Sequence, residues 1–342
     1  METYVLIAVI LVVTTGASLF NLRVLRLPES VGLMATALVA SLVLLLFGLV
    51  FPDIMQPISD RVAGFDFSFI VLDLLLGFLI FAGAFASDTA AMARERWPIL
   101  FFATAGILIS TFFVAGAMWF VLEALDIGIP FLNCLLFGAL ISPTDPIAVL
   151  AILKTTAVPR SLRADIAGES LLNDGVAVVV FLTLFQLAGG EAPSQGSAYG
   201  VWEVTALFGR EVIGGIVLGF IGAFIAKSAL KIGRVDTIDI LITLTIVMAV
   251  YGVAWKLHVS GPLALVVVGI MLRGALHEPN VAVTERDHVE IFWEAIDHVL
   301  NAVLFTLMGF ILMNLASSFT PIYLVAGLLA IPVVLSARLF CL

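Results

Sequence analysis

The stretch that decides the fold is Ser142-Pro-Thr-Asp-Pro146, which lies inside the apolar run Phe131–Leu153. A run of this length can cross the hydrocarbon of a bilayer as a helix. Pro143 and Pro146 each lack a backbone N–H, so they remove two helical donors and leave carbonyl oxygens without partners. Irregular backbone at that depth is tolerated only where protein buries it or where it lines a wet cavity. The stretch therefore predicts a spanning helix that is broken around Thr144-Asp145-Pro146.

A second apolar run, Ile166–Leu187, contains Gly168-Glu-Ser-Leu-Leu-Asn-Asp-Gly175. Ser170 and Asp174 are four residues apart, so on a helix they share one face. A carboxylate in hydrocarbon costs at least a few kcal/mol and is a functional-site hypothesis by default. Asp174, together with Asp145 in the first run, is therefore a leading candidate for function.

The composition is that of a polytopic, all-α membrane protein. Hydrophobic residues make up 62% of the 342 positions and charged residues 12%, about half the charged share of a soluble domain. Hydropathy predicts eleven spans, and we expect the ninth, which is short and contains Gly261-Pro262, to be tilted or partly irregular. The spans are Thr3–Phe20, Val31–Phe51, Phe67–Phe85, Ile99–Leu122, Phe131–Leu153, Ile166–Leu187, Glu211–Ala229, Ile238–Trp255, Val259–Leu272, Phe292–Met313 and Ile322–Leu342.

The basic residues sort between alternate loops. The odd-numbered loops carry twelve Lys and Arg residues, and the even-numbered loops with their adjoining helix ends carry three. Basic loops stay cytoplasmic, so we expect the N-terminus to lie outside. This orientation puts Glu169 and Arg338 at similar depth in the cytoplasmic half. We interpret them as a structural ion pair, because two opposed buried charges more often form a clamp than a ligand set.

The polar groups near the break suit a hard cation. The Ser170 hydroxyl, the Asp174 carboxylate and loosened carbonyls around Thr144 form a set of oxygen ligands, which suits a hard cation rather than a soft metal. Burial disfavours the charged carboxylate, so Asp174 can hold a proton or a cation but not both. Asp145 is also a candidate ion ligand, but beside two prolines it could instead hydrogen-bond to freed amides and contact the ion only through water. The hydroxyls of Thr144 and Ser170 could likewise bond only to their own helices.

The two motifs together resemble the signature of the sodium/proton antiporters of the cation:proton antiporter superfamily, and in particular the sodium/proton exchanger branch. Phe292–Phe305 and Ala337–Leu339 are also similar to later helices of its members, so the resemblance covers the chain from about Asp73 onward. It implies an inverted-repeat fold of about thirteen helices, a homodimer, and a place in the inner or plasma membrane of a prokaryote.

The resemblance also implies how one membrane unit, residues 1–342, is divided. Residues 1–90 and 200–315 would form a scaffold at the dimer interface, and residues 97–188 and 320–342 would form a mobile core. In that core Asp174 would be the exchanged ligand of Na⁺, with Ser170 and the Thr144 carbonyl beside it. Asp145 would act on the ion through water, and Glu169 would pair with Arg338. Pro143 and Pro146 would form the break in the helix. Asn173 is typical of members that exchange one ion for one proton.

We therefore expect a secondary active transporter that exchanges Na⁺ or Li⁺ for H⁺ by alternating access, with no cofactor beyond the transported ions. We expect membrane lipid around it, no nucleic-acid partner and no enzymatic activity. Members of the family continue beyond the position of Leu342 into a second broken helix, so we also expect the chain to be C-terminally incomplete. Two alternatives stay open. One is a truncated fragment without transport; the other is an intramembrane aspartyl protease, although Leu172-Asn173 before Asp174 departs from the Gly-x-Gly-Asp pattern.

Overall fold

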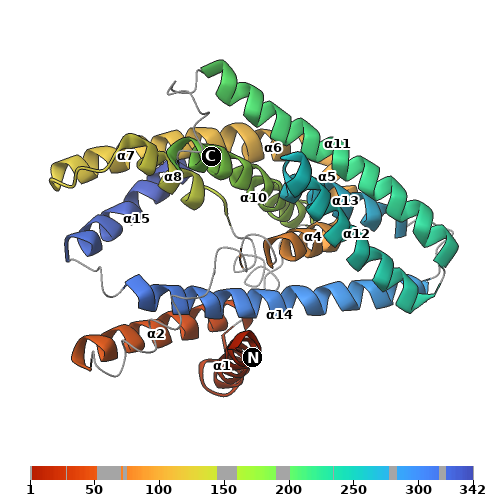
Figure 1. The fold of residues 1–342 in the computed structure, drawn as a ribbon, viewed down its shortest axis with the longest axis horizontal. Coiled ribbons are helices and arrows are strands. Elements are labelled where there is room, and N and C mark those ends of the chain that lie inside the picture. Colours follow the sequence, from red (N-terminus) through yellow and green to blue (C-terminus); the bar gives the residue numbers. More distant parts are fainter. Residues whose placement is uncertain are drawn as a thin grey trace. The chain divides into compact units, whose positions relative to one another are not determined.

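The computed structural model describes residues 2–27, 29–51, 71, 75–144, 160–189, 201–233, 235–276, 283–315 and 321–341. The regular structure in these ranges is helical, with no strand among them (Figure 1). The elements are α1 (Glu2–Phe20), the π-helix η1 (Asn21–Leu25), α2 (Glu29–Val50), α4 (Leu76–Ala86), α5 (Thr89–Arg94), α6 (Arg96–Phe101), the π-helix η3 (Phe102–Gly106), α7 (Ile107–Ala124), α8 (Phe131–Ile141), α10 (Arg160–Gly189), α11 (Val201–Gly233), α12 (Asp236–Leu257), α13 (Gly261–Leu276), α14 (Val283–Leu315) and α15 (Pro321–Cys341).

Each predicted span overlaps a described helix, although parts of Phe67–Phe85 and Phe131–Leu153 lie outside the described residues. Among the described residues, seven helices are long and apolar enough to cross a membrane. Val31–Ala40, Leu76–Ala86, Phe131–Ile141 and Gly261–Leu276 are shorter apolar helices. Helices are the expected form because backbone N–H and C=O groups in hydrocarbon find partners only within their own segment. The number of membrane crossings stays a prediction.

The chain forms two compact units. The first contains α1, η1, α2 and the part of α14 from Glu294 onward. In this unit a hydrogen bond of 2.9 Å between the hydroxyls of Thr14 and Thr306 joins α1 to α14. The second contains the described residues from 80 to 293 together with α15. In the second unit α7 packs against α8 and α15, α8 packs against α10, and α10 packs against α11 and α13.

Helix α13 differs from the irregular segment that we expected. It is a regular helix of 16 residues, and Pro262 lies in its first turn, where a missing N–H breaks no intrahelical bond. The hydroxyl of Ser260 accepts a hydrogen bond of 3.2 Å from the N–H of Leu263 and caps the helix. Most of its side chains are buried, because the helix is apolar on all sides and packs against α10, α11 and α12.

The first part of α14 is fixed within the second unit by polar contacts to α12 and α13. Glu290 forms an ion pair of 2.5 Å with Arg273 near the end of α13. The indole N–H of the buried Trp293 donates to the hydroxyl of Thr243 on α12 at 3.0 Å. These contacts hold the polar part of α14 that precedes its apolar part.

Helices α11 and α13 approach so closely that their contact requires glycine. A Cβ atom on Gly219 would lie 2.6 Å from the backbone oxygen of Ala264 and 2.7 Å from the Cβ of Val267. On Gly215 a Cβ atom would lie 2.6 Å from the backbone oxygen of Ser260. The two backbones are therefore in direct van der Waals contact, and neither can yield without shifting a whole helix.

We predict that Gly219→Ala lowers the free energy of unfolding by about 1–3 kcal/mol, because the added methyl group overpacks the α11–α13 contact. Gly209→Ala on the same helix is the matched control, since a Cβ there has nothing within 4 Å. Because alanine favours helix, the control should be neutral or stabilising by up to about 1 kcal/mol. Thermal unfolding of both variants in detergent measures the difference, and equal melting temperatures would contradict the contact.

Candidate ion site

Helix α10 carries most of the candidate site. Ser170 and Asn173 are each 1% exposed, whereas Glu169 and Asp174 are half-buried. All four lie within Ile166–Ala188, one of the segments apolar enough to cross a membrane. A hydroxyl and an amide that are buried this deeply need hydrogen-bond partners, because an unpaired polar group in an apolar place is costly.

The partners of Ser170 and Asn173 come from the first motif. The Ser170 hydroxyl donates to the backbone oxygen of Thr144. The Asn173 amide nitrogen donates to the Thr144 hydroxyl at 2.9 Å. Thr144 thus joins the two motifs, through bonds to residues 26 and 29 positions later in the chain. Ser170 and Asn173 lie about one turn and one residue before Asp174 along α10.

Asn173 also presents an oxygen to this region. Its side-chain oxygen is buried and has no hydrogen-bond partner among the described residues. An unsatisfied buried acceptor costs about 1–3 kcal/mol, so native structures usually pair such a group with a ligand, an ion or a water. Together with the Thr144 and Ser170 oxygens it adds an acceptor to a site already rich in oxygen.

The end of α8 explains how Thr144 leaves the helix. Helix α8 ends at Ile141, and Ser142 still donates to the carbonyl of Gly138 at 3.0 Å. In a continuing helix the Ser142 carbonyl would accept from residue 146, which is a proline without an N–H. The guanidinium of Arg338 on α15 donates to this carbonyl instead. A cation at this position also complements the negative end of the α8 dipole.

The structure thus brings Ser170, Asn173, Thr144 and Arg338 to the same region of the second unit. Pro143 is half-buried beside them, whereas Asp145 and Pro146 lie outside the described residues, so their roles stay predictions. The ion pair between Glu169 and Arg338 also stays a prediction. The contact from Arg338 to Ser142 was not predicted, although the missing N–H of Pro146 could have indicated it.

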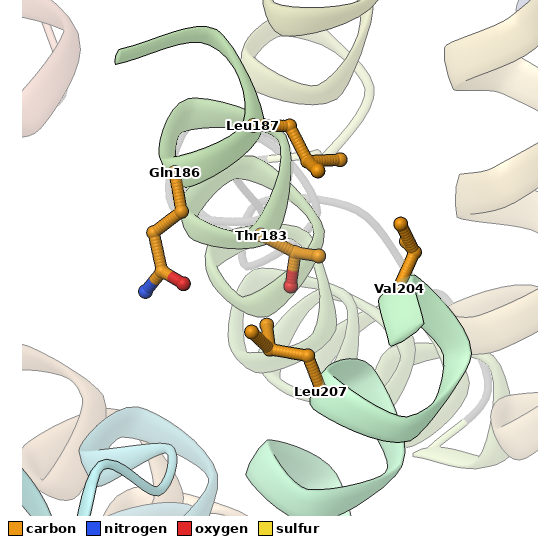
Figure 2. Close-up of a pocket in the computed structure, with 5 residues that line it drawn as sticks. All are labelled: Thr183, Gln186, Leu187, Val204 and Leu207. Atoms are coloured by element: carbon orange, nitrogen blue, oxygen red, sulfur yellow. The ribbon is translucent and has the colours of Figure 1, made fainter. Parts of the chain in front are cut away.

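A small pocket lies elsewhere, between α10 and α11 (Figure 2). It is lined by Thr183, Gln186, Leu187, Val204 and Leu207, and none of these belongs to the candidate site. Its water-accessible volume is about 10 Å³, roughly what one water molecule needs. The Thr183 hydroxyl already donates to the carbonyl of Val179 in its own helix, so the pocket offers little to a ligand.

Long apolar helices with polar side chains buried between them define an integral membrane protein. A family model described as "Sodium/hydrogen exchanger, transmembrane" matches residues 7–342. The chain belongs to this sodium/hydrogen exchanger family, as the two motifs had indicated.

Individual relatives agree with this assignment. The chain is 40% identical over 322 residues to the Na(+)/H(+) antiporter NhaP of Pseudomonas aeruginosa, covering 92% of this chain and 73% of that protein. It is 25% identical over 315 residues to the Na(+)/H(+) antiporter NhaH of Halobacillus dabanensis, covering 91% and 74%. The fold is similar to that of the sodium proton antiporter MjNhaP1 from Methanocaldococcus jannaschii at pH 8, with a TM-score of 0.72, 18% identity, and coverage of 100% of this chain and 80% of that one.

We predict that the bond between Asn173 and Thr144 couples the two motifs energetically. Asn173→Ala and Thr144→Val should each destabilise the protein, and the double variant should be less destabilised than the sum by about 0.5–1.5 kcal/mol. Thermal or denaturant unfolding of the four proteins measures this coupling. Additive losses would show that the 2.9 Å contact contributes nothing to stability.

Proposed function

We propose that the chain exchanges Na⁺ or Li⁺ for H⁺ across the membrane, with Asp174 as the group that both ions occupy. The observation that carries the proposal is the junction of Ser170 and Asn173 with Thr144, because it gathers oxygen ligands beside a carboxylate within an apolar helix. The names of the relatives, which are Na(+)/H(+) antiporters, support the same activity.

The chemistry of the site favours a small hard cation. The Thr144 carbonyl, the Ser170 hydroxyl and the Asp174 carboxylate supply oxygen ligands, and one carboxylate neutralises one positive charge. A proton on Asp174 neutralises the negative charge of the carboxylate and occupies one of its oxygens, which is then no longer available as a ligand. Cation and proton therefore exclude each other, and exclusive occupancy couples the two fluxes when the site faces each side of the membrane in turn.

The neighbouring groups have supporting roles in this proposal. Asp145 acts on the ion through water, and Glu169 pairs with Arg338 as a structural clamp. With Asn173 uncharged, one Na⁺ exchanges for one H⁺, so no net charge moves and the membrane potential does not drive the exchange. A homodimer in a prokaryotic plasma membrane, with residues 97–188 and 320–342 as the mobile core and the N-terminus outside, completes the proposal.

Asp174→Asn should abolish Na⁺-dependent proton flux, because an amide cannot alternate between a proton and a cation. The matched control is Asp126→Asn, an exposed aspartate after α7 with a φ of 58°, a conformation that asparagine tolerates well. A pH-sensitive dye inside proteoliposomes measures both variants. Proton-coupled sodium flux that survives in Asp174→Asn would refute the role of this carboxylate.

Competition at one carboxylate also fixes how the exchange depends on pH. Lower pH should raise the apparent KM for Na⁺ by at most about tenfold for each pH unit, because one proton displaces one cation. Proton binding and cation binding weaken each other to the same extent. The maximal rate at saturating Na⁺ should change much less. Initial rates over a series of Na⁺ concentrations at several pH values test this, and a KM that is independent of pH would exclude direct competition.

A further inference from the structure

Three buried hydroxyls tie the chain just before Thr144 to helix α7. The Ser142 hydroxyl donates to that of Ser110 at 3.0 Å, and the Thr111 hydroxyl donates to that of Ser142 at 3.4 Å. All three side chains are buried, at 2%, 6% and 1% exposure for Ser142, Ser110 and Thr111. We refer to Ser110, Thr111 and Ser142 as the hydroxyl cluster.

The surroundings of the hydroxyl cluster make its bonds costly to break. Ile107, Val114 and Ala139 each lie three residues, or about one helical turn, from a member of the cluster, and they are buried in two apolar clusters. A hydroxyl that loses its partner in such a place finds no water to replace it. The cluster therefore holds α8 to α7 in one register.

Backbone packing restricts the same contact. A Cβ atom on Gly138 would lie 2.4 Å from the backbone oxygen of Thr111. The two helices are thus in contact one turn before Ser142, so α8 cannot approach α7 more closely. The hydroxyl cluster prevents the opposite movement, in which the end of α8 would swing away from α7.

The position of Thr144 follows from that of Ser142. Two residues of chain span at most about 7 Å, and the intervening Pro143 has a fixed φ. Arg338 holds the Ser142 carbonyl while the hydroxyl cluster holds the Ser142 side chain. Ser142, two residues before the candidate ligand Thr144, is therefore restrained at two of its groups, by α7 and by α15.

We propose that the hydroxyl cluster is a positioning device that sets where the Thr144 carbonyl lies and thereby tunes the affinity of the site for Na⁺ and Li⁺. The proposal rests on the proposed function, since it gives Thr144 the role of an ion ligand. Selectivity between cations of the same charge depends on the size and rigidity of the ligand cage. If the Thr144 carbonyl is held less firmly, the size of the ligand cage changes. The binding free energies of Na⁺ and Li⁺ then change by different amounts. Ser110, Thr111 and Ser142 are positioning residues, because they act through Thr144.

The test is steady-state kinetics of Ser142→Ala, Ser110→Ala and the double variant in proteoliposomes. Ser110→Ala, which loses one buried hydrogen bond, should raise the KM for Na⁺ and for Li⁺ by about threefold to tenfold. Ser142→Ala loses two such bonds and should raise both KM values by at least as much. The ratio of the two KM values should shift, and the maximal rate should change less than KM. Because Ser110 and Ser142 share one bond, the double variant should be no worse than about the larger single effect.

Thr183→Ala is the matched control. It also removes a buried hydroxyl from the second unit, but that hydroxyl is bonded within α10, so KM should not change. An unchanged KM ratio and KM values within about twofold of wild type in the cluster variants would overturn the proposal, as would an equal rise of KM in Thr183→Ala.

If the alanine variants do not fold, the nearly isosteric Thr111→Val replaces them, and loss of folding in that variant too would assign the cluster to stability alone. If the wild-type protein shows no exchange, the proposed function itself is refuted. If the wild-type protein exchanges ions and the cluster variants have unaltered KM values, only the positioning role is refuted.

Discussion

Satisfying backbone carbonyls inside an apolar environment is the constraint on which the second unit depends. Pro143 and Pro146 remove donors at the end of α8, and each freed carbonyl in hydrocarbon costs several kcal/mol unless another group donates to it. Arg338 supplies a donor to Ser142, and Ser170 supplies one to Thr144. The Ser142 carbonyl loses its helical donor at Pro146, whereas the Thr144 carbonyl lies beyond the end of α8. Helices α15 and α10 meet residues 142–144 at these two carbonyls.

The same constraint explains why the proposed ion site coincides with the end of a helix. A continuous helix would bury its polar backbone and leave nothing for an ion. The predicted break would expose oxygens, which need rigid surroundings to stay in place. Close backbone contacts provide this rigidity, at Gly138 against α7 and at Gly215 and Gly219 against α13. Packing without side chains is stiff, because it has no rotamers to adjust.

Much of this architecture could be predicted from the sequence, because hydrocarbon imposes simple rules on it. Apolar runs located the helices, and the spacing of Ser170, Asn173 and Asp174 placed them together on α10. The extents of α11 and α14 could not be predicted in this way. Hydropathy detects only the part of a helix that matches lipid, whereas the polar first turns of α14 are held by partners distant in sequence, such as Arg273. The partner of Ser142 depends on tertiary contacts for the same reason.

Helix α11 has 33 residues, which corresponds to about 50 Å at the usual rise per residue. The hydrocarbon of a typical bilayer is only about 30 Å thick. Even a strongly tilted α11 therefore extends into the headgroup layer, where the amphipathic indole of Trp202, 82% exposed in its first turn, is well suited. The tilt of this helix would be smaller in a thicker membrane and larger in a thinner one. Lipid chain length would therefore affect the packing of α11 against α13.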